Sequence, residues 1–162
     1  MKRTEKELIL AGPNLRSWMT DGASKKGLVD LVKERGIRVT LILATYETLG
    51  AVSPEGAIHL RHSVRDIQEM VGKLEGDERG LMSVYFHVGA STLSAVFIDP
   101  DTTDGILFFS PRWAIQYVPQ DRLTCIIDKK INSESLFKAL HNSVLLMTQG
   151  DAKTIEDMVA AL

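Results

Sequence analysis

The chain has 162 residues, of which 44% are hydrophobic and 25% are charged, and its formal net charge is −2 at pH 7. This length corresponds to one domain, at roughly 100–200 residues per domain, and the hydrophobic content excludes a disordered chain. The balanced charge excludes a protein-wide basic field for nucleic acid or an anionic membrane. Cys125 is the only cysteine, which excludes an intramolecular disulfide and a zinc site built from several cysteines.

The apolar run in the N-terminal region is too short for a signal peptide or a transmembrane helix. Its apolar run, residues 8–11, is followed directly by Gly12 and Pro13. A signal peptide needs roughly 7–15 apolar residues and a transmembrane helix about 20. We therefore expect a cytoplasmic protein without membrane association, with residues 1–162 as a single domain that stands alone or belongs to a longer protein.

Residues 8–43 predict a strand, a helix and a second strand. The apolar run at 8–11 ends in a turn. Apolar residues at helical spacing follow Ser24, the predicted N-cap, and Gly36 is the predicted C-terminal glycine. Residues 37–43 are β-branched and then wholly apolar, as in a buried parallel strand. Together these segments predict a βαβ unit.

The next segment, residues 44–60, lacks a clear hydrophobic period. It contains Gly50, Pro54 and Gly56, so we predict a long loop with at most one helical turn. A helix is then predicted to begin at Ser63, because Ser63 to Asp66 resembles a capping box. Its apolar stripe consists of Val64, Ile67, Met70, Val71 and Leu74.

The second half of the chain is rich in strands. Four β-type runs lie at 81–88, 94–99, 105–110 and 123–128. Turn residues between 99 and 105 predict a hairpin. A helix capped by Asn132 or Ser133 carries the stripe Leu136, Phe137, Leu140, Val144 and Met147, and a further helical stretch contains Ile155, Met158, Val159 and Leu162. The order of elements predicts an α/β fold with a mixed α+β sheet, parallel at first and flanked by helices.

Common cofactor, metal and hydrolase motifs are absent from the sequence. There is no G-x-G-x-x-G, no G-x-x-x-x-G-K-[ST] and no G-x-S-x-G. His59 and His62 lie beside Arg61, a cation that disfavours a metal ion, so we interpret this segment as a solvated basic loop. We predict no metal and no cofactor. Cys125 has apolar neighbours and is predicted to be buried and inert.

One predicted strand ends at Asp99, is preceded by Thr92 and Ser94, and is followed by a strand that ends at Ser110. This order resembles the core of the phospholipase D-like superfamily, whose signature is H-x-K-x4-D followed by a small polar residue on the next strand. With Asp99 at the aspartate, Thr92 occupies the histidine position and Ser94 the lysine position. Residues 33–39 also resemble the superfamily's helix, R-G pair and apolar strand. The resemblance spans most of the chain as a pattern of elements and implies a phospholipase D-like sandwich.

The resemblance implies a member without catalytic activity. Phosphodiesterase chemistry in the superfamily needs an imidazole nucleophile and a cation on the phosphate oxygens, and neither Thr92 nor Ser94 supplies them. Non-catalytic members serve as ligand-sensing or dimerisation domains of regulatory proteins. We therefore expect such a domain, with a small-molecule or phosphate-containing ligand. The candidate ligand-binding residues are Asn14, Arg61, His87, Thr92, Ser94, Asp99 and Ser110.

The resemblance also implies a homodimer. A complete cleft in the superfamily takes two copies of the half-site, and this chain has no internal repeat that would supply a second copy. A two-fold contact between two chains is the simplest closed arrangement. We expect the turn at 91–94 and the loop at 110–113 near the axis, with Trp113 as an interface anchor.

Two other functions stay open at this point. One is an enzyme of the hydrolase or phosphodiesterase type, with a site in the 44–62 segment and near Thr92. The other is a purely structural oligomerisation domain. We do not expect nucleic acid to bind through this domain alone, because its basic pairs, such as Lys25-Lys26, are scattered and balanced by acidic residues.

Overall fold

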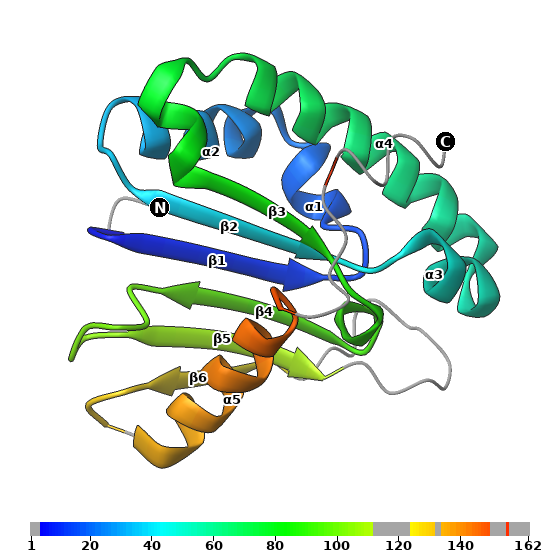
Figure 1. Cartoon of the computed structure of the whole chain (residues 1–162). Coiled ribbons are helices and arrows are strands. Elements are labelled where there is room, and N and C mark those ends of the chain that lie inside the picture. The colour runs from blue at the N-terminus through cyan, green and yellow to red at the C-terminus, as the bar shows by residue number, and fades with distance from the viewer. Residues whose placement is uncertain (1–3, 112–123, 132–133, 150–154, 156–162) are drawn as a thin grey trace.

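The computed structural model describes residues 4–111, 124–131, 134–149 and 155, and a six-stranded sheet forms its centre (Figure 1). The strands are β1 (Glu7–Gly12), β2 (Arg38–Leu43), β3 (Met82–Phe86), β4 (Leu93–Ile98), β5 (Ile106–Pro111) and β6 (Cys125–Asp128). Their order across the sheet is β3-β2-β1-β4-β5-β6. β1, β2 and β3 are parallel, whereas β4, β5 and β6 run antiparallel to the strands they follow in this order. The predicted α/β fold with a mixed sheet, parallel at first, is confirmed.

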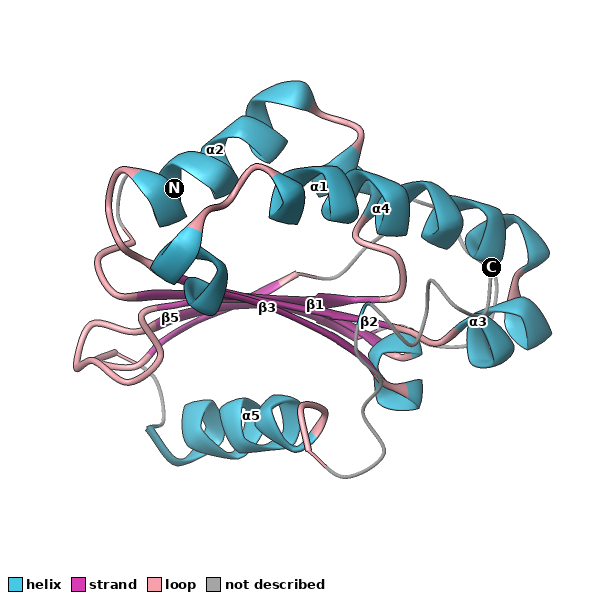
Figure 2. Cartoon of the chain, turned by 45° about the horizontal axis from the view of Figure 1, so that its top comes forward, coloured by secondary structure: helices cyan, strands magenta, loops and turns pink. Residues whose placement is uncertain are grey.

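Helices cover both faces of the sheet. They are α1 (Arg16–Met19), α2 (Gly22–Lys33), α3 (Tyr46–Val52), α4 (Pro54–Gly72) and α5 (Glu134–Leu146), with the short 3-10 helices η1 (Gly76–Leu81) and η2 (Val88–Ser91). Figure 2 shows α1, α2 and α4 over one face and α5 over the other. The central strands are therefore covered on both sides.

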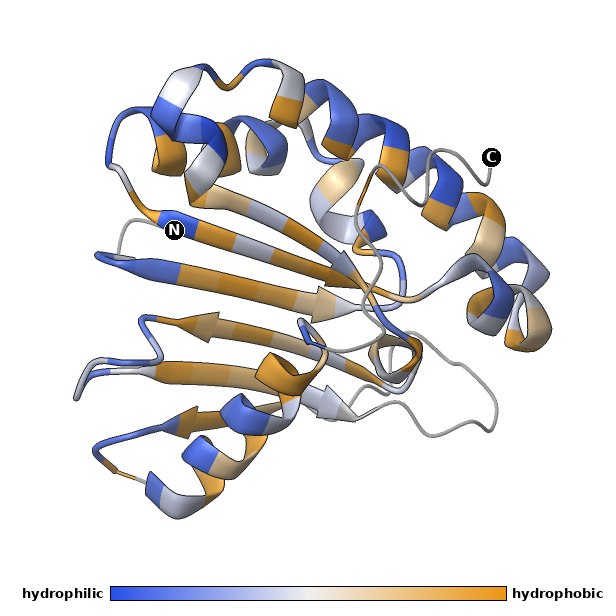
Figure 3. Cartoon of the chain, viewed as in Figure 1, coloured by the Kyte–Doolittle hydropathy of each residue, from blue (hydrophilic) through white to orange (hydrophobic). Residues whose placement is uncertain are grey.

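Alternate residues of β1 divide the core between these two layers. Leu8 and Leu10 pack beneath α2 and α4, whereas Ile9 and Ala11 pack beneath α5. Successive side chains of a strand point to opposite faces, so a strand covered on both sides needs apolar residues at every position. This explains the hydrophobic colour that Figure 3 shows along most of β1. It also explains β2, in which Leu41, Ile42 and Leu43 are all fully buried.

The segment at 44–62 is helical, so the predicted loop is wrong. The side chain of Thr45 caps α3 by accepting from the Thr48 N–H at 3.3 Å. The Ser53 hydroxyl caps α4 by accepting from the Gly56 N–H at 3.0 Å, and Pro54 is the first helical residue. Proline suits this position because its missing N–H would have no partner in the helix. Ser63 consequently lies inside α4 and is not an N-cap.

The N-cap of α2 also differs from the prediction. Asp21, not Ser24, precedes the helix, and its carboxylate accepts from the Ala23 N–H at 3.2 Å and the Ser24 N–H at 3.0 Å. The Ser24 hydroxyl donates to the same carboxylate at 2.6 Å. These hydrogen bonds, the one from the Ser24 hydroxyl foremost, lower the pKa of Asp21. Both residue types cap helices, so the two candidates could not be separated by type alone.

The strand-rich second half is confirmed. The four predicted runs correspond to β3, β4, β5 and β6, and β4 and β5 form the predicted hairpin. The helix predicted before residue 147 is α5. Cys125 is half-buried rather than buried, because β6 is the last strand of the described sheet. The predicted cap at Asn132 or Ser133, most of the stretch at 155–162, and Trp113 lie outside the described residues.

Candidate functional site

Five of the predicted ligand-binding residues lie at one end of the sheet. This end combines the carboxyl ends of β1, β2 and β3 with the start of β4 and the end of β5, because β4 is antiparallel to β1 and β5 to β4. Ligands of open α/β sheets bind outside the carboxyl ends of the parallel strands. The five residues are Asn14, His87, Thr92, Ser94 and Ser110.

Most of these side chains make local hydrogen bonds. Asn14 Oδ1 accepts from the Arg16 N–H at 3.1 Å, and the Thr92 hydroxyl donates to the Gly89 carbonyl at 2.9 Å. Ser110 Oγ lies 2.8 Å from Thr124 Oγ1. His87 Nδ1 accepts from the Gly89 N–H at 3.0 Å, so the neutral ring carries its proton on Nε2. These bonds shape the loops at the strand ends.

Asp99 lies at the opposite end of β4 and has a structural role. It is 7% exposed, and its carboxylate accepts from the N–H groups of Glu5, Lys6 and Glu7 at 2.9, 2.7 and 2.9 Å. Its backbone φ of 49° places it in the left-handed region at the start of the hairpin turn. The carboxylate therefore binds the N-terminal segment to the β4–β5 hairpin.

Arg61 also lies apart from the strand-end residues. It is exposed on α4, with its guanidinium carbon 6.0 Å from the ring centre of Tyr46 on α3. Burial raises the pKa of Tyr46, and the nearby Arg61 charge opposes that shift. Arg61 thus contacts the α3–α4 junction.

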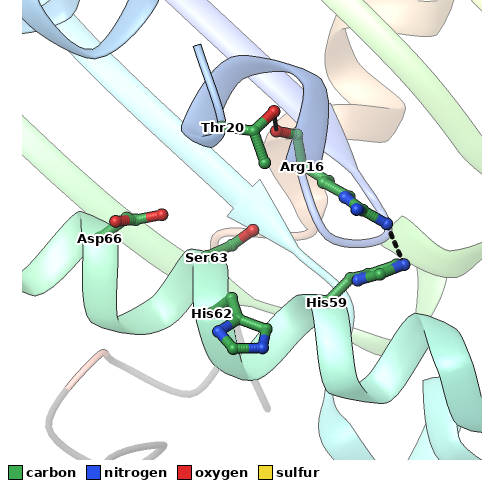
Figure 4. Close-up of a pocket in the computed structure, with 6 residues that line it drawn as sticks. All are labelled: Arg16, Thr20, His59, His62, Ser63 and Asp66. Carbon is green, nitrogen blue, oxygen red and sulfur yellow. Dashed lines mark hydrogen bonds between the residues drawn. The ribbon is translucent and has the colours of Figure 1, made fainter. Parts of the chain in front are cut away.

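A pocket of about 290 Å³ lies between α1 and α4 (Figure 4). Its lining residues are Arg16, Thr20, His59, His62, Ser63 and Asp66. His59, Ser63 and Asp66 follow one another at steps of four and three residues, which places them on one face of α4. The Asn14 turn positions Arg16 at the start of α1. This pocket, which we call the α1–α4 pocket, adjoins the end of β1.

Arg16 and Glu55 both contact the same imidazole nitrogen, but Arg16 needs it as an acceptor and Glu55 needs it as a donor. The Arg16 guanidinium contacts His59 Nε2, and Glu55 Oε1 lies 3.2 Å from the same atom. Nε2 accepts from the guanidinium only when it carries no proton, and it donates to the carboxylate only when it carries one. One of the two contacts is therefore always unsatisfied: the contact from Arg16 when Nε2 carries a proton, and the contact to Glu55 when it does not.

The other end of the pocket is electrically balanced. Lys25 Nζ lies 3.0 Å from Asp66 Oδ1, and both side chains are partly buried. His62, next to Ser63 on α4, has its Nδ1 3.1 Å from a guanidinium nitrogen of Arg65. The pocket thus has Arg16, His59 and Glu55 at one end and the Lys25–Asp66 ion pair at the other.

The sequence analysis missed this pocket because it placed His59 and His62 on a loop. The available signal was the pair Ser53-Pro54, an N-cap followed by a proline at the first helical position. A helix begun there would have put His59, Ser63 and Asp66 on one face. The partner residue Arg16 gave no such signal, because its distance from His59 is set by the packing of α1 on α4.

The structure offers no described metal centre. Within the described residues, no group of three or more His, Cys, Asp and Glu side chains could hold a metal ion. No described helix is long and apolar enough to span a bilayer.

Comparison with known proteins gives no assignment. The chain matches no protein-family model, no curated protein and no solved structure.

Proposed function

We propose that this chain is a non-catalytic ligand-binding domain of a regulatory protein, and that its ligand carries a phosphate or similar anionic group. The α1–α4 pocket holds the anion. The observation that carries this proposal is that Arg16 and Glu55 both contact His59 Nε2, which can form a hydrogen bond with only one of them at a time.

An anion in the pocket would give Arg16 an acceptor other than His59 Nε2. Arg16 then donates to the anion, and the His59 tautomer with its proton on Nε2 donates to Glu55. Arginine suits this role because its planar fork of N–H donors matches phosphate and carboxylate oxygens. The carboxylate of Asp66 does not oppose the anion with a full charge, because Lys25 neutralises it.

The arrangement of the histidines supports binding without catalysis. Among the described residues, the histidine hydrogen bonds join Arg16, Glu55, Arg65 and the Gly89 N–H, and none joins a hydroxyl or thiol. A nucleophilic enzyme needs such a pair of nucleophile and base. The resemblance to the phospholipase D-like superfamily, with Thr92 and Ser94 at the His and Lys positions, supports the same proposal. No turnover of bis-p-nitrophenyl phosphate is expected, and turnover that is lost in Thr92→Ala would contradict this.

Calorimetric titration with inorganic phosphate, alongside thermal unfolding, tests the anion site. We expect phosphate to bind the native protein and to raise its unfolding temperature, since a ligand that binds only the folded state stabilises it. Arg16→Gln should abolish binding. Arg38→Gln, the control, makes the same charge change on β2, at the end of the sheet away from the pocket, and should bind as the original does.

The variants also separate specific binding from a salt effect. Phosphate stabilises most folded proteins weakly because it is excluded from their surface, and that effect is the same in all three proteins. Equal phosphate responses in the original protein and in Arg16→Gln would therefore refute the anion site.

A further inference from the structure

The α1–α4 pocket continues beyond the anion end. The rise of α4 is about 1.5 Å per residue, so Ser63 lies about 6 Å and Asp66 about 10.5 Å along the helix from His59. Figure 4 shows Arg16 and His59 at one end of the pocket, Asp66 at the other, and Ser63 between them. The pocket therefore offers polar groups to more than a bare anion.

Ser63 is a buried residue that lines the pocket. It is 1% exposed, yet its hydroxyl oxygen is not among the fully buried described atoms that lack a hydrogen-bond partner, which are Thr4 Oγ1, Tyr46 Oη and His141 Nε2. Figure 4 shows this hydroxyl on the side of α4 that faces α1. A ligand in the pocket can form a hydrogen bond with it, because a hydroxyl both donates and accepts.

The Asp66 carboxylate favours a neutral hydrogen-bond donor on the ligand over a cationic one. Its Oδ1 accepts from Lys25 Nζ at 3.0 Å, which balances its charge and leaves Oδ2 as an acceptor. A neutral hydroxyl can donate to Oδ2 without adding charge. A ligand ammonium would place a second cation beside Lys25.

We infer that the pocket recognises a phosphate monoester of a polyhydroxylated compound of about hexose size, with the phosphate at Arg16 and His59 and hydroxyls at Ser63 and Asp66. This inference rests on the proposed function and names its ligand class. The volume of about 290 Å³ lies at the small end of ligand pockets, which are roughly 300–1,000 Å³, and suits one hexose phosphate. The distance from His59 to Asp66 is too long for inorganic phosphate alone to satisfy both ends.

A matched set of ligands tests the inference by calorimetric titration. Glucose 6-phosphate and cyclohexylmethyl phosphate share a six-membered ring and a phosphate on an exocyclic carbon, but only the first has hydroxyls. We expect glucose 6-phosphate to bind about tenfold more tightly, the value for one or two additional hydrogen bonds. Asp66→Ala and Ser63→Ala should each reduce that ratio towards one. Glu69→Ala, on the exposed side of α4, is the control and should retain it.

The outcomes separate this inference from the proposed function. Equal affinity of the original protein for the two esters would overturn the hydroxyl subsite while leaving the anion site in place. Tighter binding of glucosamine 6-phosphate than of glucose 6-phosphate would also overturn it, because the far end would then select a cation. Absence of binding by inorganic phosphate and by both esters would overturn the anion site itself. The comparison of ligands on the original protein needs no variant to fold.

Discussion

At the scale of single residues, Asp99 shows how a carboxylate can be essential to the fold without contacting a ligand. Its three backbone hydrogen bonds, from Glu5, Lys6 and Glu7, are all 2.9 Å or shorter. Asp99→Ala would leave these donors without a partner, so we expect a loss of about 2–4 kcal/mol in the free energy of unfolding, measured in urea. Asp101→Ala, at an exposed position two residues later, should change it by less than about 0.5 kcal/mol. A loss below about 1 kcal/mol for Asp99→Ala would contradict the structural role.

His141 gives a pH-dependent prediction at the same scale. It is 7% exposed on α5, its ring centre is 5.3 Å from that of Phe97, and its Nε2 has no hydrogen-bond partner among the described residues. Burial lowers its pKa below the ordinary value of 6.5, Asp101 opposes this shift and Lys129 adds to it. The unfolded chain therefore takes up a proton at a higher pH than the folded protein does.

The contribution of neutral His141 to stability is complete above pH 6.5 and is lost as the pH falls from there through the folded-state pKa. We expect the urea midpoint to fall over this range, and His141→Gln to weaken the fall. His62→Gln, at an exposed position, should leave the fall unchanged. The same pH dependence in His141→Gln as in the original protein would show that other groups cause it.

At the scale of the elements, β2 forms the centre of the parallel part of the sheet, between β1 and β3. Leu41 is 0% exposed and pairs with Leu10 of β1 and Val84 of β3. Leu41→Ala should therefore cost about 2–5 kcal/mol, as expected for a large-to-small change in a core that cannot collapse around the cavity. Urea unfolding measures this loss. A cost below about 1 kcal/mol would be inconsistent with a central buried strand, and Ile126→Ala on the exposed face of β6 provides the comparison.

The strands could be predicted because buried strands have a recognisable pattern of apolar residues in the local sequence. Residues 37–43 are apolar at five of seven positions, including 41–43, and such a short run is typical of a strand covered on both faces. The hairpin at 99–105 was equally local, since its turn residues fix the backbone angles. These features depend on the residues within the segment and on few distant contacts.

The α3–α4 segment was mispredicted because glycine and proline have more than one structural use. Gly56 was interpreted as a loop residue, yet a Cβ at this position would lie 2.9 Å from Ser53 Oγ, so glycine permits the close capping turn. Pro54 begins the helix rather than interrupting it. Because the start of α4 was not predicted, the α1–α4 pocket was not predicted either. The contact between Arg16 and His59 depends on the packing of α1 on α4, which no local sequence pattern indicates.

At the scale of the whole molecule, the two faces of the sheet are covered unequally. Helices α1, α2 and α4 lie over β1, β2 and β3, whereas β4, β5 and β6 extend beyond them (Figures 1 and 2). Val96, Phe108 and Ile126 are cross-strand neighbours and share this extended face, as do Ser94 and Ser110 one pair further on. Val96 and Phe108 are half-buried, and Ile126 is 61% exposed. We call this surface the β4–β6 face.

We propose that the β4–β6 face contacts a second copy of the chain in a homodimer. Its apolar centre, bordered by the Ser94–Ser110 pair, supports an isologous contact, in which each chain presents the same patch. The homodimer expected from the phospholipase D-like resemblance places its axis near the same two serines.

Light scattering at micromolar concentration should therefore give a mass near twice 17.9 kDa. Ile126→Glu should lower it towards 17.9 kDa, because a two-fold contact would bring two buried carboxylates together. Val52→Glu changes another exposed apolar residue, on α3, and should remain dimeric. A monomeric mass for the original protein would refute the dimer, and a dimer unaffected by Ile126→Glu would place the contact elsewhere.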